Sequence, residues 1–158
     1  MFRQMRAAFV MSSDERGAHT CIVIDADPMA VRQALCALFD RLMAGRMSAD
    51  ARDAAQIVLA EALNNIVEHA YAQSPGEIEL TIDISARGLN CRIMDAGAPL
   101  PGVGVPVGEL APLRPGDDLP EGGFGWHLIR SLSEDLNYRR EGERNLLSFR
   151  ISAQQYPH

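Results

Sequence analysis

The stretch SADARDAAQIVLAEALNNIVEHAYA, residues 48–72, carries the strongest pattern in the chain. One set of apolar side chains recurs there at three- and four-residue steps, as expected for a helix that buries one face. These side chains are Leu59, Leu63, Ile66 and Ala70. Ser48 stands where a hydroxyl caps the first turn of a helix, and Pro75 and Gly76 end the run. The sequence therefore predicts a long amphipathic helix packed on a core.

Three polar residues lie on the other side of this predicted helix. Glu61, Asn65 and Glu68 follow the spacing i, i+4, i+7, which stacks them on a face roughly opposite the apolar stripe. Most charged faces of amphipathic helices simply contact water, so this face also has an ordinary structural interpretation. His69 has no second histidine or cysteine at metal-ligand spacing, which favours packing or hydrogen bonding over metal binding.

Predicted strands and two further helices flank the long helix. The β-branched run AHTCIVID at 18–25 predicts a strand, and Pro28 opens a helix that reaches about Ala44. Another helix begins at about Phe124. Four more predicted strands lie in EIELTIDISARG (77–88), LNCRIMDAG (89–97) and the pair within DLNYRREGERNLLSFRIS (135–152).

Residues 96–125 are rich in glycine and proline and show no periodicity. Such a stretch is long for a passive loop, and it is either a disordered insertion or a lid over a ligand. Asp95 precedes it at the end of a predicted strand. Its carboxylate forms either an Asx turn or an acceptor for an exocyclic amine, with Gly97 leaving room for a flat ring.

Glycines also precede the last predicted helix. Gly122, Gly123 and Gly125 lie where free backbone N–H groups and the helix dipole bind an anion such as a phosphate. Glycines before a helix are also ordinary loop material, and this run is not the G-x-G-x-x-G of a dinucleotide fold.

Composition narrows the classes of protein. The 158 residues are 47% hydrophobic and 23% charged, which is typical of one globular domain. A net charge of −6 disfavours direct nucleic-acid binding, and the absence of lysine excludes a Walker-type phosphate loop and Schiff-base catalysis. Three scattered cysteines suggest neither disulfides nor zinc, and no signal or membrane segment is expected. We expect a cytoplasmic protein with a flexible N-terminal arm at 1–17.

Three motifs follow one another along the chain. The first is E-x-x-x-N on a predicted helix, the second is D-x-G-x-P after a predicted strand, and the third is G-G-F-G at the start of another predicted helix. With this combination the sequence resembles the GHKL ATPase superfamily and its Bergerat ATP-binding fold, most closely the small bacterial anti-sigma factors that are serine protein kinases. The residues that carry it are EALNNIVEHAY (61–71), DAGAP (95–99), GGFGWHLIRSLSEDLNYRR (122–140) and RNLLSFRI (144–151).

The resemblance covers residues 18–152 and implies an α+β fold. This is a two-layer α/β sandwich with a mixed, mostly antiparallel sheet and helices on one face. A lid loop is expected at about 97–122, and residues 153–158 form a C-terminal tail.

The resemblance also implies roles for single residues. Asn65 would bind the Mg²⁺ that bridges the ATP phosphates, and Glu61 would orient or deprotonate the attacking hydroxyl. Asp95 would accept the adenine N6 hydrogen beside Gly97. Gly123 and Gly125 would offer amides to the phosphates. The sequence departs from the family pattern at two of these positions. Ser148 stands in the place near adenine usually held by threonine, and Trp126 stands in the glycine motif where a smaller aliphatic residue is common.

The leading hypothesis is an anti-sigma kinase that phosphorylates a serine of a small anti-anti-sigma (STAS-like) partner. Dissociation of the phosphorylated partner would free this protein to sequester a sigma factor, and a homodimer is expected by resemblance. A second hypothesis is a module that binds nucleotide and sequesters its partner without phosphoryl transfer. A third is a histidine-kinase catalytic module separated from its dimerisation helices.

Overall fold

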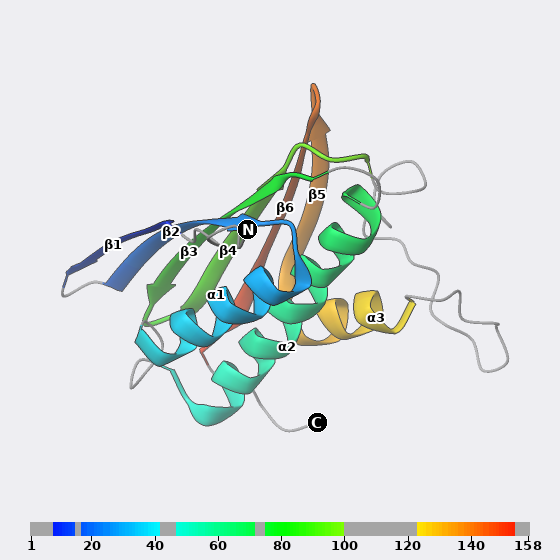
Figure 1. Ribbon diagram of the computed structural model, residues 1–158. Coiled ribbons are helices and arrows are strands. Elements are labelled where there is room, and N and C mark those ends of the chain that lie inside the picture. Colours follow the sequence, from blue (N-terminus) through cyan, green and yellow to red (C-terminus); the bar gives the residue numbers. More distant parts are fainter. Residues whose placement is uncertain (1–7, 15–16, 42–46, 72–74, 100–122, 154–158) are drawn as a thin grey trace, which may run out of the picture.

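A computed structural model describes residues 8–14, 17–41, 47–71, 75–99 and 123–153. Six strands form one sheet in the order β1-β2-β3-β4-β6-β5, and the helices cover one face of it (Figure 1). The strands are β1 Ala8–Asp14, β2 Gly17–Asp25, β3 Glu77–Ser85, β4 Gly88–Asp95, β5 Glu134–Glu141 and β6 Arg144–Ser152. The helices are α1 Pro28–Arg41, α2 Ala49–Asn65, the π-helix η1 Ile66–Ala70 and α3 Gly123–Leu132. The two-layer α+β fold is therefore confirmed.

Every pairing between the described strands is antiparallel, so the sheet is not mixed. Because side chains alternate along a strand, one face of the sheet collects the apolar residues. Leu80 of β3 lies opposite Ile93 of β4, and Cys91 lies opposite Phe149 of β6. All four side chains are buried against the helices.

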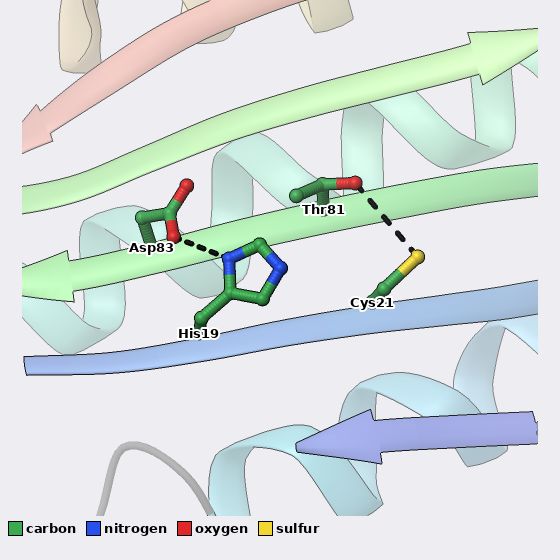
Figure 2. A network of polar contacts seen from close by, with 4 residues as sticks. All are labelled: His19, Cys21, Thr81 and Asp83. Atoms are coloured by element: carbon green, nitrogen blue, oxygen red, sulfur yellow. Dashed lines mark hydrogen bonds and ion pairs between the residues drawn. The ribbon is translucent and has the colours of Figure 1, made fainter. Parts of the chain in front are cut away.

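The opposite face of the sheet is polar. Figure 2 shows His19 and Cys21 of β2 beside Asp83 and Thr81 of β3. Nδ1 of His19 lies 2.5 Å from Oδ1 of Asp83, and the Thr81 hydroxyl donates to Sγ of Cys21 at 3.9 Å. Both side chains are about half exposed, so water competes with this contact and it adds little stability. This face is the solvated side of an antiparallel sheet.

The helices begin where the sequence predicts. Asp27 accepts a hydrogen bond from the Ala30 amide at 3.0 Å, and Ser48 accepts one from the Ala51 amide at 3.2 Å. Three members of the predicted apolar stripe are buried: Leu59 and Leu63 of α2 are fully inaccessible, and Ile66 of η1 is 8% exposed. Helix α3 packs against α2 and buries Ile129.

The predicted N-terminal arm differs from the structure in one part. Residues 8–14 form β1, which pairs with β2 from Ala8 opposite Val23 to Asp14 opposite Gly17. The pairing satisfies backbone groups along β2 that would otherwise form a sheet edge. Residues 1–7 and 15–16 of the arm, and 100–122 of the expected lid, lie outside the described residues. In the part of the chain that is described, no helix is long and apolar enough to cross a membrane.

Candidate functional site

A pocket lies between the C-terminal end of α2, the start of α3 and the ends of β4 and β6. It brings together Asn65 and Asp95, which are 30 positions apart in the sequence. Its lining consists of Ala62, Asn65, Ile66, Asp95, Ala98, Trp126, Tyr138, Asn145 and Leu147. The pocket therefore joins the helix motif, the strand-end motif and the first turn of α3.

Asn65 is the last residue of α2 before the π-helix η1, a type of helical irregularity that is frequent at functional sites. Its side chain is 6% exposed, and among the described residues its Nδ2 atom has no hydrogen-bond partner. A buried N–H donor without a partner costs free energy. A ligand that accepts a hydrogen bond from Nδ2 of Asn65 would remove that cost. An amide oxygen is also a ligand type that Mg²⁺ accepts.

Glu61 lies one helical turn before Asn65 and is half-buried. Gly125, in the first turn of α3, approaches both side chains closely. A Cβ atom added to Gly125 would lie 2.6 Å from Oε2 of Glu61 and 3.5 Å from Nδ2 of Asn65. Only glycine fits this contact without displacing a neighbour, so the glycine motif packs directly on the E-x-x-x-N motif. Glu68, by contrast, is exposed on η1.

Asp95 ends β4 and is 5% exposed. Its Oδ1 accepts hydrogen bonds from the Gly97 amide at 2.9 Å and from Nδ2 of Asn145 at 2.8 Å. The structure thus contains the Asx turn that the sequence allowed. Burial raises the pKa of Asp95, although the bonds from Asn145 and Gly97 and the charge of Arg140 act in the opposite direction.

Asn145 is a pocket residue that the sequence analysis missed. It lies opposite Asp95 in the β4–β6 register and is 3% exposed. Its Nδ2 also donates to the carbonyls of Gly97 (3.2 Å) and Ala98 (3.1 Å), while its Oδ1 accepts from Tyr138 (2.6 Å) and Arg140 (2.9 Å). The available signal was the two-residue period of β6, which aligns Asn145 with the buried Leu147, Phe149 and Ile151.

Ser148 is not brought to this pocket. Strand alternation separates it from Asn145 and Leu147 and puts it opposite Arg92, on the polar face of the sheet. The β6 residue beside Asp95 is therefore Asn145 and not Ser148. Gly123 begins α3, and Trp126 lines the pocket.

Few protein atoms at this site could bind a metal ion. Within the described ranges, no three histidine, cysteine, aspartate or glutamate side chains are grouped to hold a metal ion. A Mg²⁺ site does not need such a group, because that ion commonly takes only one or two protein ligands and completes its shell with phosphate and water. Asn65 would serve such a site through its side-chain oxygen, whereas its unpartnered Nδ2 is a hydrogen-bond donor suited to a phosphate oxygen.

Residues 24–151 match the family model described as the histidine kinase-like ATPase domain. This chain belongs to that family. It is also similar to the serine-protein kinase RsbW of Bacillus cereus (strain AH820) and of Bacillus anthracis (strain A0248), each 31% identical over 103 residues. Each match covers 63% of this chain and 64% of the relative. This chain therefore matches less than two thirds of the length of each of these relatives.

Two solved structures are similar as well. One is the histidine kinase domain from the Erythrobacter litoralis EL346 blue-light activated histidine kinase, with 17% identity, coverage of 80% of this chain and 60% of that chain, and a TM-score of 0.46. The other is the Acinetobacter baumannii histidine kinase AdeS, with 15% identity, coverage of 96% and 71%, and a TM-score of 0.43.

Proposed function

We propose that this protein binds Mg-ATP in the pocket and transfers the γ-phosphate to a serine of a small anti-anti-sigma partner. One observation carries the proposal: Glu61 and the unpartnered amide of Asn65 lie on one face of α2, with Gly125 of α3 packed directly over them. The similarity to RsbW serine-protein kinases supports this choice of reaction.

The adenine end of the pocket is formed around Asp95. Both of its hydrogen bonds within the described residues go to Oδ1, which leaves Oδ2 to accept the exocyclic amine of adenine. Apolar surface from Ile66 and Leu147 borders the same pocket. A flat apolar ring with one polar edge fits such a mixture of residues.

The phosphate end is formed by Asn65 and by the start of α3. The first N–H groups of a helix have no intrahelical partner, so the amides at Gly123 and Gly125 are suited to phosphate oxygens. Asn65 would hold Mg²⁺ through its side-chain oxygen. When bound, the metal ion neutralises charge that develops on the phosphates.

In the transfer step, the serine hydroxyl oxygen forms a bond to the γ-phosphorus as the bond to the β–γ bridging oxygen breaks, which releases ADP. The Glu61 carboxylate orients the hydroxyl and accepts its proton. Phosphoserine adds about −1.5 to −2 charges to the partner. Because this protein carries a net charge of −6, repulsion favours release of the phosphorylated partner.

The released protein would then bind and sequester a sigma factor. We propose that it acts as a homodimer in the cytoplasm, where ATP and sigma factors are both found. It need not contact DNA or RNA, in keeping with its acidic charge.

The test is to incubate the protein with Mg-ATP and each anti-anti-sigma protein encoded near its gene, and to look for phosphoserine by mass spectrometry. The proposal predicts phosphoserine with wild type and none with Glu61→Ala. Nucleotide binding without phosphate on any of these partners would instead support the sequestration module. Phosphohistidine on a partner would support the histidine-kinase alternative.

A further inference from the structure

Tyr71 connects the helix that carries Asn65 to the turn that follows Asp95. It is the first residue after η1 and follows Asn65 by six positions. Its hydroxyl donates to the Glu77 carbonyl at 2.9 Å and accepts from the Ala96 amide at 2.9 Å. One hydroxyl therefore joins the end of the Asn65 helix to the start of β3 and to the residue that follows Asp95.

Packing fixes the tyrosine ring as well. The ring is half-buried against the hydrophobic core. A Cβ atom added to Gly76 would lie 2.0 Å from Cε1 and 2.5 Å from Cζ of Tyr71, so the ring lies directly on the Gly76 backbone. Glycine is required for this approach, because a side chain there would push the ring away.

The amide that Tyr71 holds belongs to the turn that carries Asp95. Ala96 donates to the Tyr71 hydroxyl, and the next amide, Gly97, donates to Oδ1 of Asp95. Two successive N–H groups are thus fixed, one by the helix side of the pocket and one by the carboxylate itself. Asn145 holds the same carboxylate from β6, but among the described residues its hydrogen bonds do not reach α2 or η1.

We propose that Tyr71 is a positioning residue for nucleobase recognition. Its hydroxyl sets the Asp95 turn relative to Asn65, so that the base and the phosphates of one nucleotide fit their two sites together. The inference rests on the proposed Mg-ATP site. It predicts that the hydroxyl contributes to binding of the adenine amine and not to binding of the phosphates.

The test compares ligands that share phosphates and differ at the base. Calorimetric titration of the full chain with Mg-ATP, Mg-ITP and Mg-tripolyphosphate separates the two ends, because ITP has a carbonyl in place of the exocyclic amine. Tyr71→Phe keeps the ring and should weaken ATP binding about three- to tenfold. Affinities for ITP and tripolyphosphate should change less than about twofold.

A second variant removes the contact but keeps the hydroxyl. In Gly76→Ala the new Cβ displaces the ring, and we expect the same selective loss of ATP affinity. Hydrogen exchange adds a direct readout: the Ala96 amide should exchange slowly in wild type and faster in both variants. The control is Thr81→Val, which deletes a hydroxyl on the polar face of the sheet and should leave all three affinities unchanged.

The outcomes distinguish this inference from the proposed function. Wild-type ratios of ATP to ITP affinity in both Tyr71→Phe and Gly76→Ala would overturn the positioning role and leave the Mg-ATP site standing. Equal weakening of all three ligands would also overturn it, because a merely structural residue has that effect. If the wild type binds none of the ligands, the proposed function itself fails.

Discussion

The Nδ2 atom of Asn145 lies 2.8 Å from Oδ1 of Asp95, and the two residues are direct partners in the β4–β6 register. A neutral amide on one strand thus holds a buried carboxylate on the next. Among the described residues, nothing donates a hydrogen bond to the other oxygen of Asp95. The pairing of these two strands therefore fixes the group that we propose recognises adenine.

Asn145→Ala should destabilise the protein and weaken nucleotide binding. The variant leaves the Gly97 and Ala98 carbonyls and the Tyr138 hydroxyl without the amide that they contact. We expect the free energy of unfolding in urea to fall by about 1–3 kcal/mol. The control Ser148→Ala, on the other face of β6, should change it by less than about 0.5 kcal/mol. Equal effects of the two variants would contradict the assignment of Asn145 to the pocket.

Asp95→Asn should change how stability depends on pH. Burial raises the pKa of Asp95 above its ordinary value of 3.8, so the folded state binds this proton more tightly than the unfolded state. The Asp95 carboxyl therefore stabilises the folded state at pH values below 3.8. This contribution to the free energy of unfolding is lost as the pH rises through the raised pKa. Asparagine does not ionise, so the stability of the variant relative to wild type should increase between pH ~4 and pH ~7. Urea unfolding at both pH values measures this difference, and a constant difference would refute the prediction.

Gly125→Ala should impair the site through Glu61. The added Cβ would lie 2.6 Å from Oε2 of Glu61, so either the carboxylate or the first turn of α3 must move. Oε2 ends a flexible side chain that can turn away, so we expect Mg-ATP affinity to fall by only about two- to fivefold. The double variant Glu61→Ala, Gly125→Ala relieves the overlap and should recover much of the binding, which a double-mutant cycle measures. Purely additive effects would argue against direct contact.

Glu61→Gln should separate binding from chemistry. The amide has nearly the same shape as the carboxylate but cannot accept the serine proton. We expect the dissociation constant for Mg-ATP to stay within about threefold of wild type, while phosphorylation of a partner slows by about 10²-fold or more. Quench-flow or timed phosphoserine assays give the rate, and an unimpaired rate would remove Glu61 from the reaction.

Local patterns predicted most of the fold. Ser48, the apolar stripe of α2 and the alternation in β3 and β4 each act within a few residues, and all appear in the structure. Strand β1 pairs with β2, the next strand in the chain, and was missed because its residues were assigned to the flexible arm. The apolar run AAFVM (7–11) does not alternate with polar residues, so it lacks the pattern typical of a half-buried strand.

The residues of the site that belong to short motifs were predicted, whereas those that act through contacts distant in sequence were not. Glu61, Asn65 and Asp95 belong to sequence motifs; the structure brings Asn65 and Asp95 to one pocket and places Gly125 against Glu61 and Asn65. Asn145 and Tyr71 act through contacts with Asp95 and Ala96 that are distant in sequence. Ser148 was assigned to the adenine end by resemblance, in the place usually held by threonine. Side chains on a strand alternate between its two faces, and in β6 it is Asn145 that shares the pocket face.

The central claim, an Mg-ATP site built on Asn65, is tested most directly by thermal unfolding with and without Mg-ATP. A ligand that binds only the folded state stabilises it by RT ln(1 + [L]/Kd), about 2.7 kcal/mol at a hundredfold excess over Kd. We predict a higher unfolding temperature for wild type with Mg-ATP, a smaller rise with ATP and a chelator, and loss of the magnesium-dependent part in Asn65→Ala. An unchanged unfolding temperature of the wild type at millimolar Mg-ATP, or an equal magnesium-dependent rise in Asn65→Ala, would contradict the account.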